Sequence, residues 1–260
     1  MARRGIATLI YDKRGVGMST GNWKQSTFED LADDAVAAVH FLQRQANVNP
    51  RQVGIYGHSQ GGTIAPLIAT RSRDVAFVIA AAAIGMPVYQ QDLFRTRNDL
   101  RSAGFSQDEI DQAMNLYSVW LNVARTGMGH EQLKVQVETD QSQKWFKYVA
   151  PPPDESWLWK WYPPVGNYNG VPLWEKVTVP VLLLYGERDE NTPVPESIVN
   201  IERALTRAGN KDYTFVMLPR AAHDLTVGPQ AGEPFEWRRL APGISDLLVA
   251  WASARTSAGR

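Results

Sequence analysis

Residues 53–62 read Val-Gly-Ile-Tyr-Gly-His-Ser-Gln-Gly-Gly, and they join a short apolar run to a helical pattern that starts at Thr63. Gly-x-Ser-x-Gly between a strand and a helix is the setting of a nucleophile elbow, a tight turn that exposes a serine hydroxyl above a sheet. The turn predicts that a Cβ at Gly57 or at Gly61 would collide with the chain. The following helix directs its free N–H groups and the positive end of its dipole at Ser59. The stretch predicts a nucleophilic Ser59, the alternative being a Gly-rich turn that contains a serine by chance.

The bulk properties of the chain exclude several classes of function. The 260 residues suffice for one large core with an insertion, and the formal net charge is zero, with no basic stripe for a nucleic-acid partner. The absence of cysteine excludes disulfides, thiolate catalysis and cysteine metal sites. The apolar runs are too short to span a bilayer, and residues 1–10 have too short an apolar part for a signal peptide. We therefore expect a cytoplasmic protein without a membrane span.

Strand and helix patterns alternate over the first 84 residues. Continuous apolar runs, which are typical of buried parallel strands, lie at residues 5–11, in the stretch before Ser59 and at residues 75–81. Between the first two runs, Ser26-x-x-Glu29 predicts a capping box at the start of an amphipathic helix. The order strand, helix, strand, helix, strand predicts an α/β fold with a mostly parallel sheet.

The alternation stops between residues 85 and 172, where no buried strand is expected. Helical patterns cover residues 91–103, 106–125 and, more weakly, 130–143, and Ser106-x-x-Glu109 predicts a capping box at the start of the second. Residues 151–164 form a stretch rich in Pro and Trp that we interpret as irregular. We interpret the whole region as a helical cap inserted into the α/β core.

The core would then consist of residues 1–84 and 173–260, because the regular alternation resumes after the cap. Strands are expected at residues 179–186 and 213–218, and helices at about 195–208 and 243–254. The last of these helices would dock Leu247, Leu248 and Trp251 on the sheet.

A serine hydroxyl needs a base to take its proton, and the four histidines can be compared for this role. His40 lies in an amphipathic helix, His58 cannot turn its ring back to Ser59, and His130 lies in the cap. His223 follows the last strand, at the sheet edge where open α/β sheets collect their sites. His223 is therefore the predicted base.

The acid that orients the base should follow another strand, between the serine and the histidine in chain order. The strand at 179–186 runs into Gly-Glu-Arg-Asp-Glu-Asn-Thr-Pro at residues 186–193. Asp189 is the preferred candidate, and Glu187 and Glu190 remain open.

Four motifs together resemble the α/β-hydrolase superfamily and, within it, bacterial carboxylesterase-like and prolyl-oligopeptidase-like hydrolases. They are Gly-His-Ser-Gln-Gly-Gly at 57–62, Tyr-Gly-Glu-Arg-Asp-x-x-Thr-Pro-Val at 185–194, Ala-Ala-His-Asp at 221–224 and Tyr-Asp-Lys-Arg-Gly-x-Gly-x-Ser at 11–19. The resemblance implies Ser59 as nucleophile, Asp189 as acid, His223 as base and the Gln60 N–H as an oxyanion-hole donor. It also implies that Asp12 and Arg14 brace each other beside the elbow, and it implies no metal and no organic cofactor.

The motif at 11–19 departs from the family in its position. In the family it follows the fourth of eight strands, and here it follows the first expected strand, so we expect an N-terminally shortened sheet, from truncation or as a natural variant. The loop that normally carries the second oxyanion donor would be missing, and losing one donor typically costs about 100- to 1000-fold in rate. We hypothesise that the loop 12–19 or a partner chain supplies that donor, or that a homo-oligomer covers the exposed sheet edge.

The aromatic residues of the insertion hold the cap together, and we expect at least two of them to line an apolar pocket over Ser59. The ten are Trp120, Trp145, Phe146, Tyr148, Trp157, Trp159, Trp161, Tyr162, Tyr168 and Trp174. No charged cluster there indicates a phosphate, CoA or a peptide terminus in the substrate. The sequence thus predicts a serine carboxylesterase for small, fairly apolar esters. The alternatives are a peptidase or amidase, a lactonase, an acyltransferase, or a non-catalytic remnant of the fold.

Overall fold

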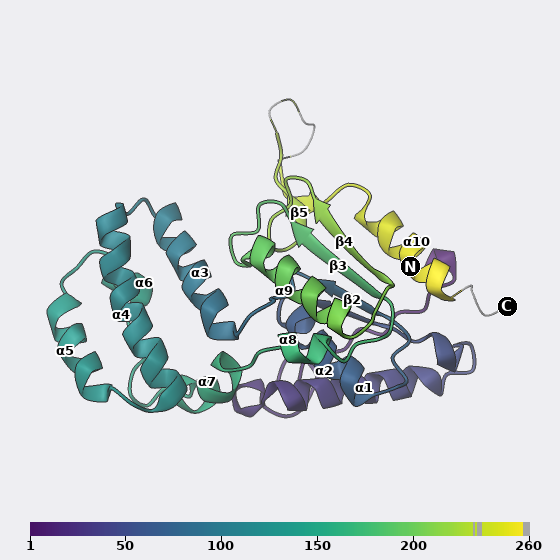
Figure 1. Ribbon diagram of the computed structural model, residues 1–260, viewed down its shortest axis with the longest axis horizontal. Helices are drawn as coiled ribbons and strands as arrows, with labels where there is room; N and C mark the ends of the chain where they lie inside the picture. Colours follow the sequence, from purple (N-terminus) through teal and green to yellow (C-terminus); the bar gives the residue numbers. More distant parts are fainter. Residues whose placement is uncertain (231, 233–235, 257–260) are drawn as a thin grey trace.

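The structure, a computed structural model, describes residues 1–230, 232 and 236–256, and it is built around a four-stranded parallel sheet (Figure 1). The strands β1 (Ile55–His58), β2 (Val78–Ala81), β3 (Val181–Gly186) and β4 (Tyr213–Leu218) lie side by side in chain order. Val78 pairs with Val181, and Val181 pairs with Tyr213. The chain therefore leaves every strand at the same edge of the sheet.

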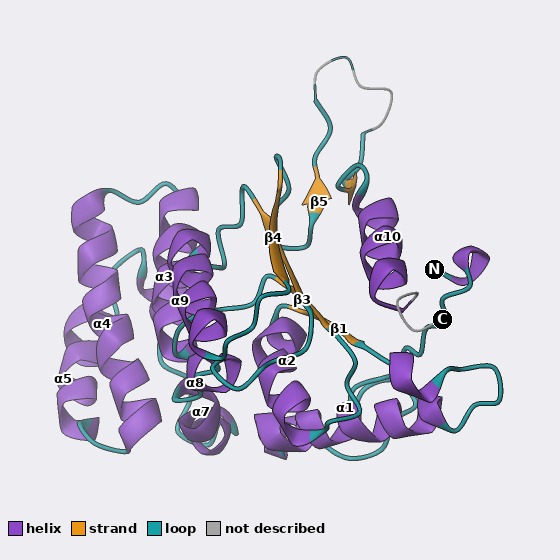
Figure 2. Cartoon of the chain, turned by 45° about the vertical axis from the view of Figure 1, so that its right-hand side comes forward, coloured by secondary structure: helices purple, strands orange, loops and turns teal. Residues whose placement is uncertain are grey.

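Helices cover both faces of this sheet, as Figure 2 shows. The helices α1 (Phe28–Gln43), α2 (Gln60–Arg71) and α9 (Val194–Arg207) lie on one face, and α10 (Ile244–Thr256) lies on the other. Successive residues of β3 point to opposite faces of the sheet. Val181 and Leu183 belong to a first apolar cluster, on the face of α1, α2 and α9, and Leu182 and Leu184 belong to a second, on the face of α10. Trp251 of α10 is buried in the second cluster, with Leu247 and Leu248 packed against it, as predicted.

Short elements complete this part of the chain. They are the 3₁₀ turns η1 (Ala2–Arg4), η2 (Trp23–Gln25) and η3 (Pro50–Gln52), the one-turn helix α8 (Val171–Trp174) and the two-residue strands β5 (Thr226–Val227) and β6 (Arg239–Leu240).

The chain between β2 and β3 forms a group of helices beside the sheet (Figure 1). They are α3 (Val88–Ser102), α4 (Gln107–Thr126), α5 (His130–Asp140), α6 (Phe146–Val149) and α7 (Leu158–Gly166). They enclose an apolar cluster of their own, in which Leu100 and Leu116 are fully buried. The prediction of an irregular conformation for residues 151–164 is wrong from Leu158 onward, where α7 begins. The spacing of Tyr162 and Val165 lets one side of this helix be buried. The exact division into core and cap stays a prediction.

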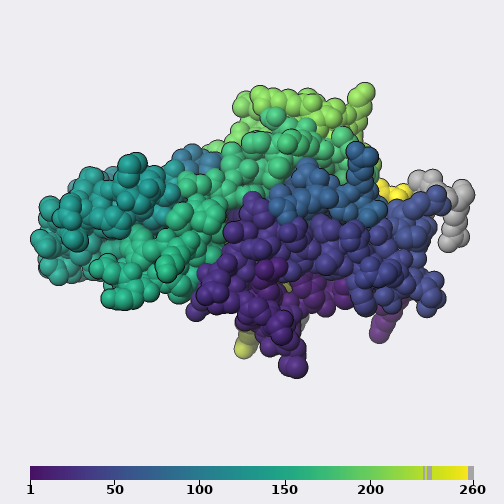
Figure 3. All heavy atoms as spheres, turned by 90° about the horizontal axis from the view of Figure 1, so that it is seen from below, coloured from purple at the N-terminus to yellow at the C-terminus, as the bar shows by residue number. Residues whose placement is uncertain are grey.

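Residues 5–11 do not form the buried strand that their apolar pattern predicts. The segment pairs with no described strand, and Ile10 is 91% exposed. A strand requires a neighbour that satisfies its N–H and C=O groups, and this segment has no such neighbour among the described strands. The N-terminal residues, in dark purple, consequently form part of the outer surface (Figure 3).

The helix starts test the two predicted capping boxes. The box of α4 is confirmed, because Ser106 and Glu109 exchange both of its hydrogen bonds. The box of α1 lies one residue later than predicted, at Thr27 and Asp30, since Ser26 instead donates its hydroxyl to the carbonyl of Asn22. No helix in the described ranges is long and apolar enough to cross a membrane, and the cytoplasmic location stays a prediction.

Candidate active site

Ser59 occupies the turn between β1 and α2 in a strained backbone conformation, with φ 55° and ψ −113°. A Cβ at Gly57 would lie 2.3 Å from the carbonyl of Gly61, so this glycine is required, as predicted. The prediction for Gly61 is wrong, because a Cβ there would meet nothing within 4 Å. The second crowded position is Gly62, whose Cβ would lie 2.6 Å from the Ala81 carbonyl oxygen. The helix thus packs against β2 through its third residue.

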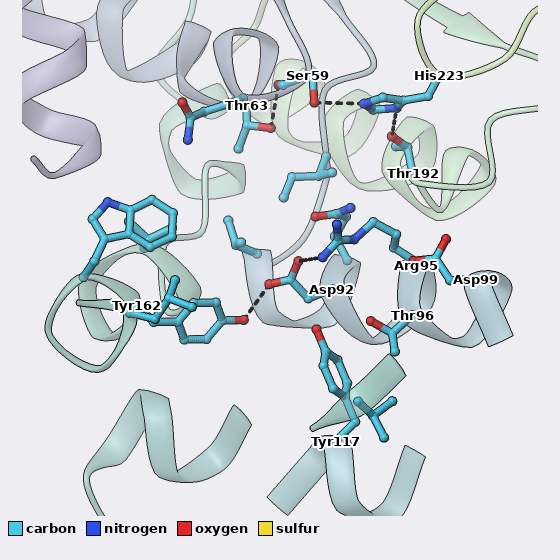
Figure 4. Close-up of a pocket in the computed structure, with 18 of the residues that line it drawn as sticks. Ser59, Thr63, Asp92, Arg95, Thr96, Asp99, Tyr117, Tyr162, Thr192 and His223 are labelled. Carbon is cyan, nitrogen blue, oxygen red and sulfur yellow. Dashed lines mark hydrogen bonds and ion pairs between the residues drawn. The ribbon is translucent and has the colours of Figure 1, made fainter. Parts of the chain in front are cut away.

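The structure brings Ser59, His223 and Asp189 together in one hydrogen-bonded chain (Figure 4 shows the first two). His223 Nε2 lies 2.8 Å from Ser59 Oγ, and His223 Nδ1 lies 3.0 Å from Asp189 Oδ2. The three residues follow the carboxyl ends of β1, β4 and β3, which the parallel sheet places at one edge.

Asp189 is held in place by its own loop. Its side chain is fully buried, and its Oδ1 accepts hydrogen bonds of 2.9 Å from the backbone N–H groups of Asn191 and Thr192. The other two candidate acids point elsewhere, since Glu187 accepts from the N–H of Arg220 and Glu190 faces Ser102 of α3. Within the described part of the chain, Asp189 is the one of these three acids that hydrogen-bonds to His223.

The other three histidines have structural contacts away from the Ser59 hydroxyl. His58 Nε2 lies 2.7 Å from the backbone oxygen of His223, so it holds the loop that carries the base. His40 pairs with Asp74 on the surface, and His130 lies beside the ring of Trp159.

The region around Gln60 contains one possible oxyanion donor. Gln60 is the first residue of α2, where backbone N–H groups have no partner within the helix. Lys13 donates to the side-chain oxygen of Gln60 at 2.7 Å, but no residue of the loop 12–19 lines the cavity at Ser59. A second donor from this loop therefore stays a prediction.

The expected contact between Asp12 and Arg14 is wrong. Arg14 donates to both carboxylate oxygens of Asp34 on α1, at 2.6 and 2.7 Å, whereas Asp12 accepts from the N–H of Met18. The Arg14 guanidinium thus forms a bidentate ion pair with α1, which is stronger than a single hydrogen bond to a carboxylate. The motif at residues 11–19 therefore fixes its own loop to α1 through Arg14.

A cavity of about 560 Å³ lies between Ser59 and the helices α3, α4 and α7. Four of the ten aromatic residues considered line it, which confirms that at least two do: Trp120, Tyr148, Trp161 and Tyr162. Three charged residues of α3 also line the cavity, namely Asp92, Arg95 and Asp99. The cavity is large enough for a small organic substrate but is not uniformly apolar.

The charged cluster is linked to Tyr162 of α7. Tyr162 donates its hydroxyl to Asp92 Oδ2 at 2.6 Å, and Arg95 Nη2 donates to Asp92 Oδ1 at 3.3 Å (Figure 4). Burial raises the pKa of Asp92, partly offset by these two contacts, and burial together with the Asp92 carboxylate raises the pKa of Tyr117 to about 12. The sequence hid this cluster, because α3 has the polar pattern of a solvated helix.

Metal binding has no visible basis in the site. Within the described ranges, no three His, Asp or Glu side chains gather as metal ligands do. The hydrogen-bonded chain from Ser59 to Asp189 is a serine-activation arrangement that needs no metal.

A parallel sheet with a serine on a strand-to-helix turn, and with a histidine and an aspartate on later strand ends, defines an α/β hydrolase. The comparison with known families agrees, because the model of the X-Pro dipeptidyl-peptidase (S15 family) matches residues 1–229. The chain belongs to this family.

Known proteins resemble the chain at low identity. Esterase EstD of Thermotoga maritima is 21% identical over 243 residues, which cover 92% of this chain and 50% of EstD. Polyketide transferase ATR5 of Stachybotrys chlorohalonatus is 32% identical over 81 residues, which cover 31% of this chain and 27% of ATR5. The chain spans half or less of the length of these curated relatives.

One solved structure carries a similarity of fold. The structure of DcsB in complex with its substrate analogue has a TM-score of 0.54 and 18% identity, and the match covers 95% of this chain and 79% of DcsB. At this identity the match shows a shared fold and indicates no particular substrate.

Proposed function

We propose that the protein is a serine hydrolase that cleaves small carboxylic esters through an acyl-enzyme. The observation that carries this proposal is the 2.8 Å contact between Ser59 Oγ and His223 Nε2, continued at 3.0 Å from His223 Nδ1 to Asp189. Membership of a serine-hydrolase family and the match over most of the chain to an esterase support it.

The proposed reaction follows from the order of the three groups. The Asp189 carboxylate accepts the Nδ1–H of His223, which leaves Nε2 free to take the proton of Ser59 as its oxygen attacks the ester carbonyl. His223 then returns that proton to the leaving alcohol, and water cleaves the acyl-enzyme by the same route. The backbone N–H groups of Asn191 and Thr192 hold the Asp189 carboxylate in place beside His223.

The Gln60 N–H is the proposed donor to the oxyanion. It opens α2, so the helix dipole also favours negative charge at that point. A single donor of this kind is typically worth about 100- to 1000-fold in rate.

Replacing the nucleophile tests the proposal. Ser59→Ala should abolish turnover of p-nitrophenyl acetate and butyrate, and it should remove labelling by a fluorophosphonate probe. Ser72→Ala, a serine outside the cavity, is the control and should keep both signals. Hydrolysis of these esters by Ser59→Ala at the wild-type rate would show that another group performs the reaction.

Amide hydrolysis is the second candidate, because the family is named for X-Pro dipeptidyl-peptidases. Such a substrate presents an ammonium group, whereas the Asp92 carboxylate at this wall of the cavity is already engaged by Arg95 and Tyr162. We therefore favour esters. A panel of p-nitrophenyl esters, lactones, acyl-transfer acceptors and Ala-Pro-p-nitroanilide separates the two, and faster cleavage of the anilide would reverse the ranking.

A further inference from the structure

The wall of the cavity opposite Ser59 carries a polar cluster that the proposed reaction does not use. Asp92 and Arg95 project from α3, one turn of helix apart, and Tyr162 approaches them from α7 (Figure 4). All three line the same cavity as Ser59 and His223. A substrate attached to Ser59 would therefore extend toward this cluster.

Asp92 is the anchor of the cluster. Its side chain is only 14% exposed, and both of its oxygens are engaged, Oδ2 by Tyr162 at 2.6 Å and Oδ1 by Arg95 at 3.3 Å. A buried carboxylate with both oxygens occupied has little capacity left for a ligand donor. Its effect is to orient Arg95.

Arg95 has donor capacity left over. Its side chain lines the cavity and is 44% exposed, and its bond to Asp92 is long. Its Nε–H is buried with no acceptor in the described part of the chain, which shows that the guanidinium is not saturated by its neighbours. A guanidinium carries five N–H donors and no acceptor, so what it can bind is an acceptor oxygen.

The charges of the wall indicate which acceptor fits. The carboxylates of Asp92 and Asp99 accompany the single guanidinium of Arg95 on α3, so the group as a whole does not favour an anion. A neutral carbonyl oxygen accepts a hydrogen bond from arginine without bringing a charge into this environment.

We propose that Arg95 is a specificity-determining residue that binds an uncharged carbonyl oxygen of the substrate, remote from the bond that is cleaved. Asp92 and Tyr162 are positioning residues that hold the guanidinium toward the cavity. This inference rests on the proposed ester hydrolysis. It assigns to the substrate class a second, keto or amide, carbonyl group.

Matched esters test the inference. Two pairs are used, each of a plain ester and its oxo analogue of equal length. The first pair is p-nitrophenyl hexanoate and p-nitrophenyl 5-oxohexanoate, and the second is butyl acetate and the acetate of 4-hydroxybutan-2-one. The two pairs place the carbonyl on the acyl side and on the alcohol side. For one of them, the wild-type kcat/KM should favour the oxo ester by about 10-fold or more, the size expected of a hydrogen bond to a charged donor.

The variants then assign the preference to the cluster. Arg95→Met keeps the length of the side chain without its donors and should bring the oxo-to-plain ratio of kcat/KM close to one. Tyr162→Phe should lower the ratio partway, through loss of the bond that orients Asp92. Arg97→Met is the matched control on the same helix, since Arg97 pairs with Asp111 and does not line the cavity, and it should leave the ratio unchanged. Thermal unfolding of each variant verifies that it is folded.

Three results would overturn the inference. One is an oxo-to-plain ratio near one for both pairs in the wild type, and another is a ratio that survives Arg95→Met. The third is a stronger, Arg95-dependent preference for the monoester of adipic acid, which would show that the wall binds a carboxylate. Turnover of the plain esters separates these failures from failure of the proposed function, because without it neither proposal stands.

Discussion

His223, the proposed base, lies on a loop but is fixed at both its backbone and its ring. His58 binds its carbonyl oxygen, and Asp189 binds its Nδ1 at 3.0 Å. The sequence predicted Ser59, Asp189 and His223 as a set, because each follows an apolar strand and parallel strands end at one edge. It could not predict that His58, next to the serine, braces the histidine, since that contact joins residues 165 positions apart.

The glycines of the elbow permit a matched prediction at the residue scale. Gly57→Ala places a Cβ 2.3 Å from the backbone of Gly61, so the turn must open, and we expect a loss of about 1–3 kcal/mol in the free energy of unfolding together with a large loss of esterase activity. Gly61→Ala meets open space within α2, where alanine favours the helix by up to about 1 kcal/mol.

Urea denaturation and p-nitrophenyl butyrate kinetics on the two variants check this difference. Equal changes in the free energy of unfolding for the two variants would contradict a specific cost of the crowding at Gly57. From the motif alone, the two glycines are indistinguishable, and only the path of the chain separates them.

Residues 5–11 show at the element scale why an apolar run is not enough to make a strand. Their composition resembles that of β3, yet β3 is hydrogen-bonded to β2 and β4 whereas residues 5–11 pair with no described strand. Hydrogen bonding to a neighbour is a property of the whole sheet and is not encoded in a local pattern. The predicted homo-oligomer at the sheet edge stays a prediction.

The start of α1 provides the element-scale prediction. Thr27 accepts the N–H of Asp30, and Asp30 accepts the N–H of Thr27 at 2.8 Å, so Thr27→Ala should lower the free energy of unfolding by about 1 kcal/mol. The bonds from the backbone and hydroxyl of Thr27 lower the pKa of Asp30. The stabilisation from the Asp30 carboxylate is therefore present above its unfolded pKa of about 3.9 and is lost as the pH falls through the lower folded pKa.

Urea denaturation at neutral pH and in a series down to about pH 3 measures both effects of the Thr27 substitution. In Thr27→Ala, part of the acid-dependent loss should disappear, because the hydroxyl contribution to the Asp30 shift is gone. Thr139→Ala, the same change inside α5, is the control and should not destabilise. An effect as large in Thr139→Ala would contradict a specific capping role.

At the scale of the whole molecule, helix α3 and the sheet meet at the loop that carries Asp189. Gln91 of α3 donates to the carbonyl oxygen of Asn191 at 2.7 Å, and Asn98 donates to that of Glu190 at 2.8 Å. These carbonyls immediately follow Asp189. The helix that carries the polar cluster of the cavity thus also supports the loop that orients His223. No sequence pattern predicts this coupling, because the amide side chains of a helix resemble ordinary surface residues.

Removing one of these amides should weaken catalysis without altering substrate preference. Asn98 does not line the cavity, and Asn98→Ala releases the Glu190 carbonyl, so the acid loop should hold Asp189 less firmly. A neutral hydrogen bond is worth about 0.5–1.5 kcal/mol, which predicts a loss of about 2- to 10-fold in kcat for plain and oxo esters alike. Arg101→Met is the control, because it removes the contact of Arg101 with the Asn98 oxygen and leaves the loop contact in place. Unchanged kcat in Asn98→Ala, or an equal loss in Arg101→Met, would show that α3 does not support the acid loop. A change confined to the oxo esters would instead place Asn98 with the Arg95 cluster.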